Sequence, residues 1–176
     1  NELLDYLAQL HREKFVLVEY GVESTSDATL ERINRGHSYQ CAVETIQRTA
    51  QRGLPVGAHF ILGLPGETRE FTVNQAEIIN QLPIDTLKLH QLQIIRGTAM
   101  AREFIRQRER AAQDVTYTSD YSLYSAAEYA SLVVDFLEKL RPDIVVERFA
   151  SSSPQALLLA PDWGLKNYEF VALVDK

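Results

Sequence analysis

Three ionisable side chains of different chemistry, Glu19, His59 and Lys88, each lie within an apolar run that is rich in β-forming residues. Burying such a side chain is costly unless it is paired or meets a ligand. An acid, an imidazole and an amine that share one cavity can accept, transfer and donate protons. His90 follows Lys88 by two residues and so shares its face of a strand. Glu19, Lys88 and His90 are therefore the catalytic candidates.

The same residues also fit a purely structural role. Glu19 and Lys88 are the two halves of an ordinary internal ion pair. A single histidine on an apolar strand, such as His59, is more often a hydrogen-bonded core residue than a ligand. The arginines between residues 96 and 110 fit a solvated helix face, with a phosphate-contacting patch as the functional alternative.

The stretch from His59 to Thr68, HFILGLPGET, organises the sequence around these residues. Its apolar run ends in a glycine-proline-glycine turn, in which Gly63 and Gly66 permit backbone torsions that other residues avoid. Thr68 then caps the next helix. A buried strand that enters a helix through a tight glycine-rich loop is where parallel α/β sheets hold their ligands.

Length and composition indicate one globular domain. The 176 residues are too few for two domains of ordinary size, and the net charge of −6 gives no general attraction to nucleic acid. The sole cysteine, Cys41, excludes an internal disulfide or a multi-cysteine metal site. No segment is typical of a membrane span or a signal peptide. We expect a soluble cytoplasmic protein. Because the sequence begins within an expected helix, we also expect it to be a piece of a longer protein.

Apolar periodicity predicts alternating helices and strands with short connections. Helices are expected over residues 1–12, 24–33, 39–53, 68–82, 100–110 and 125–140, and strands over 15–22, 55–63, 84–92 and 143–149. The first strand is expected to be covered on both faces, and Gly36 is expected to provide a left-handed helix cap. Residues 111–124 are expected to form a loop, and residues 151–176 a short tail. This alternation predicts parallel βαβ units with right-handed crossovers.

Inward-facing residues of a parallel barrel alternate along each strand, and ligand sites gather at the carboxyl ends. One face of the first strand carries Glu19, Gly21 and Glu23, and one face of the second carries Gly57, His59, Ile61 and Gly63. The third strand leaves two registers open, with either Lys88, His90 and Leu92 or Leu87, Leu89 and Gln91 directed inward.

Several short motifs together resemble the second half of a radical S-adenosylmethionine (SAM) domain. They are Gly21-Val22-Glu23-Ser24, Arg32-Ile33-Asn34-Arg35-Gly36-His37, the stretch from His59 to Thr68, and Lys88-Leu89-His90 with Arg96-Gly97-Thr98. Their order is similar to that of uncharacterised bacterial radical SAM proteins with a core like that of the Elongator catalytic subunit. Glu128-Tyr129, Arg148 and Ala160-Pro161-Asp162-Trp163 also have counterparts there.

The resemblance implies an α/β fold, a partial parallel (β/α)6 TIM-like barrel with a C-terminal α/β extension. Residues 1–110 would be the second half of the barrel core, and 111–176 an extension that completes or covers it. It also implies SAM-binding residues: Glu23 near the ribose and amino-acid end, Arg35 at the carboxylate, and His59 at a ribose-contacting position that is often aspartate. Ile61, Gly63 and Leu64 would form the floor under the adenine, bordered by Gln91 or Leu92.

The family binds a [4Fe–4S] cluster through three cysteines in a Cys-x3-Cys-x2-Cys loop, and this sequence lacks that loop. The resemblance therefore implies no metal ligand here, a cluster bound by residues upstream of Asn1, and an inactive fragment of a radical SAM oxidoreductase. The complete enzyme would use a one-electron reductant to cleave SAM to a 5′-deoxyadenosyl radical, which abstracts hydrogen from a substrate.

The substrate is open, and similarity to the Elongator subunit makes transfer RNA a candidate. One rival interpretation is a non-catalytic module that binds SAM or a nucleotide. Another is a cluster-free barrel enzyme that uses Glu19, His59 and Lys88 for acid–base chemistry. We also expect this half barrel to dimerise through its unpaired sheet edges.

Overall fold

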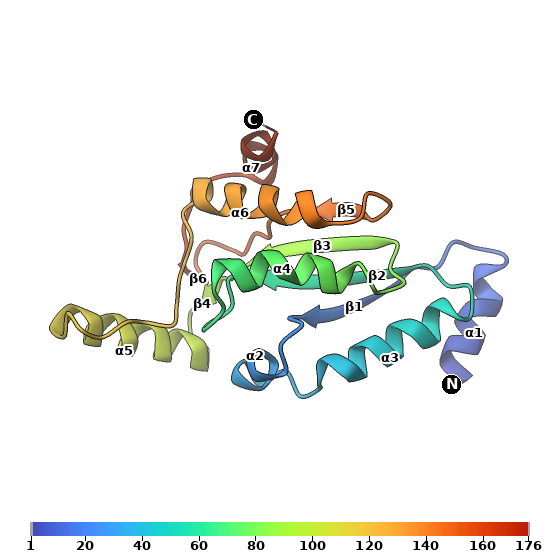
Figure 1. Cartoon of the computed structure of the whole chain (residues 1–176), viewed down its shortest axis with the longest axis horizontal. Coiled ribbons are helices and arrows are strands. Elements are labelled where there is room, and N and C mark those ends of the chain that lie inside the picture. Colours follow the sequence, from blue (N-terminus) through green and yellow to red (C-terminus); the bar gives the residue numbers. More distant parts are fainter. Residues whose placement is uncertain (1, 176) are drawn as a thin grey trace.

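The computed structural model describes residues 2–175 as a parallel sheet with helices on one side, followed by a smaller C-terminal part (Figure 1). The sheet contains β1 (Val18–Glu23), β2 (Val56–Leu62), β3 (Thr86–Gln91) and β5 (Val145–Arg148). The strand order is β1-β2-β3-β5, and every neighbouring pair is parallel. The predicted α/β fold with parallel βαβ units is therefore confirmed.

Seven helices connect or flank these strands in the described part of the chain. They are α1 (Glu2–His11), α2 (Asp27–Arg32), α3 (Tyr39–Ala50), α4 (Arg69–Ile79), α5 (Ala99–Gln113), α6 (Ala126–Lys139) and α7 (Asn167–Val174). Side-chain caps start α4 at Thr68 and α6 at Ser125, where Glu128 completes a capping box. None of the described helices is both long and apolar enough to cross a membrane.

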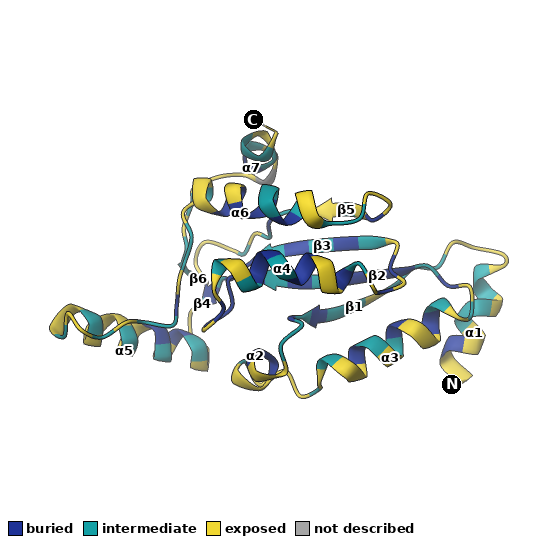
Figure 2. Cartoon of the chain, in the orientation of Figure 1, coloured by how far each residue is buried: buried dark blue, intermediate teal, exposed yellow. Residues whose placement is uncertain are grey.

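The main hydrophobic core lies between the sheet and the helices. Phe60 of β2 and Leu87 of β3 are fully buried against this layer, together with Phe136 of α6. Figure 2 shows buried residues concentrated on β2, β3 and the sides of α4 and α6 that face the sheet. The opposite sheet face carries Glu19, His59 and Lys88, which remain partly exposed. The helices thus leave one face of the sheet free for polar side chains.

The first strand differs from its prediction. β1 starts at Val18, and Phe15 before it is 77% exposed. The expectation that this strand is covered on both faces is wrong for β1, because the face that carries Glu19 lies on the side of the sheet that the helices leave free. β1 and β5 form the edges of the sheet, and dimerisation through these edges stays a prediction.

Two predicted helix ends are corrected. Asn34, at φ 57°, takes the left-handed position after α2, and the amide of Arg35 donates to the carbonyl of Leu30 at 2.9 Å. The cap is therefore a Schellman motif centred on Asn34, and Gly36 lies two residues beyond it. Helix α5 continues to Gln113, three residues into the predicted loop, because its last residues are alanines and glutamine, which favour helix.

The expected C-terminal tail contains regular structure. β6 (Leu158–Ala160) pairs antiparallel with β4 (Ile94–Ile95), and α7 packs on α6. A second hydrophobic cluster joins α5 to this region through Phe104, Ile94 and Tyr121. The extension is therefore α/β, as predicted, and it is fastened to the loop that follows β3. The boundary predicted at residue 110 stays a prediction.

Candidate ligand cavity at the carboxyl ends of the strands

A cavity of about 470 Å³ opens where β1, β2 and β3 end. Eight residues predicted for the site line it: Glu23, Arg35, His59, Ile61, Leu64, His90, Gln91 and Leu92. Sequence reasoning missed Ile33, Gln93, Met100 and Ser151 as lining residues. Gln93 and Ser151 follow the carboxyl ends of β3 and β5, and that position was the signal available in the sequence. The cavity combines an apolar side with several polar groups.

Glu23 and Arg35 form the charged wall of this cavity. Arg35 Nη2 donates to the carbonyl of Gly21 at 2.5 Å and lies 3.4 Å from Glu23 Oε1. Burial raises the pKa of Glu23, while the Arg35 guanidinium opposes that rise. A Cβ atom on Gly21 would lie 2.5 Å from Arg35 Nη2, so only glycine leaves this arrangement room. Glu23 has φ 72°, a strained conformation of the kind that gathers at ligand sites.

Glu19, His59 and Lys88 come together on the same sheet face, below the cavity. The Lys88 ammonium donates to Glu19 Oε1 and also lies 3.4 Å from Glu147 Oε2, while His59 Nε2 lies 3.3 Å from Glu19 Oε1. The hydrogen bond from Lys88 lowers the pKa of Glu19, and the same bond raises the pKa of Lys88. The ion pair that the sequence allowed as a structural role is therefore present, and His59 connects it to the cavity.

The register of β3 settles which of its residues face inward. Lys88 is paired with His59 and His90 with Ile61, while Leu87 and Leu89 enter the core. The His90 ring lies 5.5 Å from the His59 ring, and the buried His90 Nε2 has no hydrogen-bond partner among the described residues. Burial and then the nearby cationic side chains lower the pKa of His90 to about 4. His90 is thus a neutral imidazole at pH 7 with an unused nitrogen.

This neutral His90 predicts a loss of stability in mild acid. The unfolded chain binds a proton at His90 below about pH 6.5, whereas the folded chain binds it only near pH 4. The free energy of unfolding therefore falls between these pH values, by at most about 3 kcal/mol because His90 is partly exposed to solvent. Urea unfolding of the protein and of His90→Gln at pH 7 and pH 5 measures this. Equal pH dependence in both would contradict the assignment.

Two of the predicted cofactor-binding residues, Gly63 and Gln91, make contacts within the protein that distinguish them from the others. A Cβ atom on Gly63, at φ 85°, would lie 3.0 Å from the Tyr124 ring, and Gly63 does not line the cavity. The Gln91 amide is held by the backbone of Ser151, donating to its carbonyl and accepting from its amide at 2.8 Å each. Of the three residues predicted to lie under the adenine, Ile61 and Leu64 line the cavity, and their role toward adenine stays a prediction. The roles of Gly63 and Gln91 toward a cofactor stay predictions.

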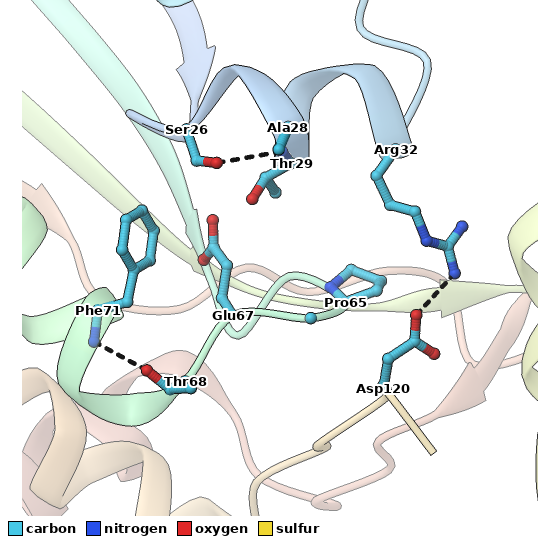
Figure 3. Close-up of a pocket in the computed structure, with 10 residues that line it drawn as sticks. Ser26, Ala28, Thr29, Arg32, Pro65, Glu67, Thr68, Phe71 and Asp120 are labelled. Atoms are coloured by element: carbon cyan, nitrogen blue, oxygen red, sulfur yellow. Dashed lines mark hydrogen bonds and ion pairs between the residues drawn. The ribbon is translucent and has the colours of Figure 1, made fainter. Parts of the chain in front are cut away.

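A separate cavity of about 490 Å³ lies between α2 and the loop before α4 (Figure 3). Glu67, from the organising stretch, points toward α2 and is 8% exposed. Ser24 Oγ donates to Glu67 Oε1 at 2.6 Å, and burial raises the pKa of Glu67. This hydrogen bond joins the loops after β1 and β2. Sequence reasoning did not single out Glu67, although its place after the glycine turn was visible.

The described residues do not fit an iron–sulfur cluster. Residues 2–175 contain no group of three or more His, Cys, Asp or Glu side chains that are placed to hold a metal ion. Cys41 is exposed on α3, away from any second thiol. The cavity above β1–β3 is suited instead to an organic ligand that has an anionic end, hydrogen-bonding groups and an apolar part.

The fold and this cavity define a parallel α/β protein of the barrel-forming class, with a candidate ligand cavity at the carboxyl ends of the strands. The chain belongs to the radical SAM superfamily. The family model described as "Radical SAM superfamily" matches residues 1–73, and "Radical_SAM C-terminal domain" matches residues 84–176.

Individual proteins agree with this assignment. The chain is 29% identical over 177 residues to the uncharacterised protein YtqA of Bacillus subtilis, covering 100% of this chain and 51% of YtqA. It is 32% identical over 89 residues to tRNA-2-methylthio-N(6)-dimethylallyladenosine synthase of Marinomonas sp., covering 48% of this chain and 20% of that enzyme. The solved structure of Elp3 from Methanocaldococcus infernus superposes with a TM-score of 0.75 at 18% identity, covering 98% of this chain and 39% of Elp3. The chain thus spans about half the length of YtqA and shares the fold of the part of Elp3 on which it superposes.

Proposed function

We propose that this chain is the SAM-binding part of a radical SAM oxidoreductase. The observation that carries the proposal is the cavity at the ends of β1–β3, where a guanidinium, a carboxylate, two imidazoles and an apolar wall meet. These groups match the parts of SAM, which has a carboxylate, an amino group, a ribose and an adenine ring.

Each part of SAM has a complementary group in this cavity. The Arg35 guanidinium suits the carboxylate, because its planar fork donates several hydrogen bonds at once. Glu23 suits the amino group or the ribose hydroxyls. His59 and the unpaired nitrogen of His90 offer further hydrogen bonds, and Ile61, Leu64, Leu92 and Met100 provide an apolar surface for the adenine. Chain contacts of this kind orient the cofactor and exclude water.

The cluster ligands are not among these residues, so we place them elsewhere in the protein. SAM and a reduced cluster would together supply radical chemistry for hydrogen abstraction, and the part of this chain would be to bind and orient SAM through Arg35, Glu23 and His59. The Glu19–Lys88 pair and His90 lie on the sheet face next to the cavity, where they contact the substrate or hold the SAM-binding residues in position. RNA is our candidate substrate, supported by the similarity to a tRNA-modifying enzyme.

Reductive cleavage of SAM tests this function directly. The complete protein, reconstituted anaerobically with iron and sulfide and given a one-electron reductant, is expected to form 5′-deoxyadenosine. Cleavage should disappear when the cysteines of a cluster motif outside this chain are replaced, and should survive Cys41→Ala, because Cys41 is exposed on α3. A folded protein that binds SAM but neither holds a cluster nor cleaves SAM would be a binding module, and the proposal would fail.

A further inference from the structure

We propose that Arg102, Arg106 and Arg110 form a stripe on α5 that binds the phosphate backbone of RNA. This inference rests on the RNA substrate that the proposed function includes, and it adds the surface that holds it. The stripe lies outside the cavity described above and uses none of its residues.

Positive charge in this chain is concentrated on and just before α5. Residues 96–110 contain five arginines against two glutamates, whereas the whole chain has a net charge of −6. An acidic chain repels nucleic acid in general, so RNA can bind only where the local charge is reversed. The α5 segment is such a place.

The arginines of this segment are free to bind an external anion. Arg32, Arg69 and Arg141 each form an ion pair with a carboxylate of the folded chain. Within the described residues, none of the five arginines between 96 and 110 forms an ion pair. Arg102 donates only to the carbonyl of Gly97, and the Arg110 guanidinium lies 4.1 Å from the centre of the Tyr117 ring. Their charges are therefore not neutralised within the fold.

The spacing of the three arginines suits an extended polyanion. Residues four apart lie on the same side of a helix, about 6 Å from one another along its axis. That repeat is on the scale of successive phosphates in a nucleic-acid strand. The three side chains are exposed, while Ala101 and Phe104 on the other side of α5 are buried. The stripe is therefore a row of cations facing solvent.

Helix α5 is joined to α2 by an ion pair, and its first turn borders the cavity. Arg32 of α2 pairs with Glu103 of α5 at 2.5 Å and with Asp120 of the following loop at 2.9 Å, so Glu103 already has a cationic partner outside the stripe. Met100, in the first turn of α5, lines the 470 Å³ cavity. Figure 1 shows α5 extending away from the sheet at the end where the strands finish. Arg102, two residues after Met100, is therefore the end of the stripe that is nearer to the cavity along the chain.

Binding of bulk tRNA to the complete protein tests the stripe, with no SAM or reductant present. The triple variant R102Q/R106Q/R110Q keeps good helix formers, so α5 should persist, which circular dichroism checks. Its affinity should fall at least about tenfold at ~0.1 M salt, and the slope of log K against log salt should shrink by about two to three. The matched control R12Q/K14Q/R48Q removes three exposed cations elsewhere and should change neither quantity appreciably.

A gain of affinity provides an independent test. Glu109 is exposed on α5 near the stripe and has no ion pair among the described residues, so E109Q should tighten tRNA binding about two- to fivefold at low salt. Unchanged tRNA affinity and salt slope in the triple variant would overturn the proposal. Equal weakening by the control, or equally tight binding of polyglutamate, would also overturn it, since the stripe would then be a general polyanion surface. SAM cleavage without RNA is measured separately, so either proposal can fail alone.

Discussion

Replacing Arg35 with alanine is expected to weaken SAM binding by about 10- to 100-fold and to leave the iron–sulfur cluster intact. Hydrogen bonds to a charged group contribute about 1.5–3 kcal/mol, which corresponds to that range. Arg35 Nη2 already donates to the Gly21 carbonyl, so the guanidinium is fixed at the end of β1 with its other donors available for a carboxylate. Equilibrium dialysis of SAM with the complete, cluster-loaded protein measures the affinity.

Two matched variants separate charge from geometry in this experiment. Arg35→Lys keeps the charge and loses the planar fork, so it should recover only part of the affinity. Arg12→Ala removes an exposed arginine that does not line the cavity, so this variant should bind SAM with normal affinity. The visible spectrum of the cluster reports whether Arg35→Ala has disturbed the rest of the site. Unchanged SAM affinity in Arg35→Ala would remove Arg35 from the proposed binding residues.

Local signals predicted the regular elements well. Thr68 and the Ser125–Glu128 capping box start their helices as the sequence indicates, and the strands around His59 and Lys88 pair in parallel. The predictions that failed depend on contacts between segments that are far apart in the sequence. The pairing of β6 with β4 joins residues more than 60 positions apart, and no local periodicity reveals such a partner. The exposure of β1 likewise depends on which face of the sheet the helices cover, and the strand's own residues do not reveal it.

The sequence predicted those site residues that follow from the alternation of side chains along a single strand. The two-residue period placed Glu19 with Glu23 and His59 with Ile61, and the structure puts each of these residues on the free face or in the cavity. Alternation could not choose between Lys88 and Leu87, because that choice depends on the register against β2. Ser151 and Met100 come from segments that reach the cavity only through tertiary packing. The sequence around Met100 carries no chemical signal, and Ser151 is marked only by its position after the last strand of the parallel sheet.

The C-terminal extension is part of the cavity as well as a cover for the core. Ser151 lines the cavity, and its backbone is held by Gln91, the last residue of β3, and by Gln93 just after this strand. Two residues earlier, the Phe149 carbonyl accepts a hydrogen bond from the Tyr129 hydroxyl at 2.9 Å. The position of this cavity wall therefore depends on α6, which lies on the far side of the sheet.

Tyr129→Ala is accordingly expected to lower the free energy of unfolding by about 3–5 kcal/mol, the usual cost of removing a large buried aromatic side chain. The Tyr129 ring is fully buried and lies 5.3 Å from the Trp163 ring and 5.5 Å from the Phe170 ring. Its loss leaves a cavity at the point where α6 meets the extension. Urea unfolding measures the change in stability, and limited proteolysis should show faster cleavage after residue 150.

Tyr129→Phe is the control that keeps the aromatic packing and removes only the hydroxyl. It leaves the Phe149 carbonyl without its donor and should cost about 1–2 kcal/mol. If the ring contacts hold the extension in place, proteolysis of Tyr129→Phe should resemble that of the unmodified protein. Equal destabilisation by both substitutions would show instead that the hydrogen bond to Phe149 fastens the extension. The wall at Ser151 would then depend on that single bond, and SAM affinity should fall equally in the two variants.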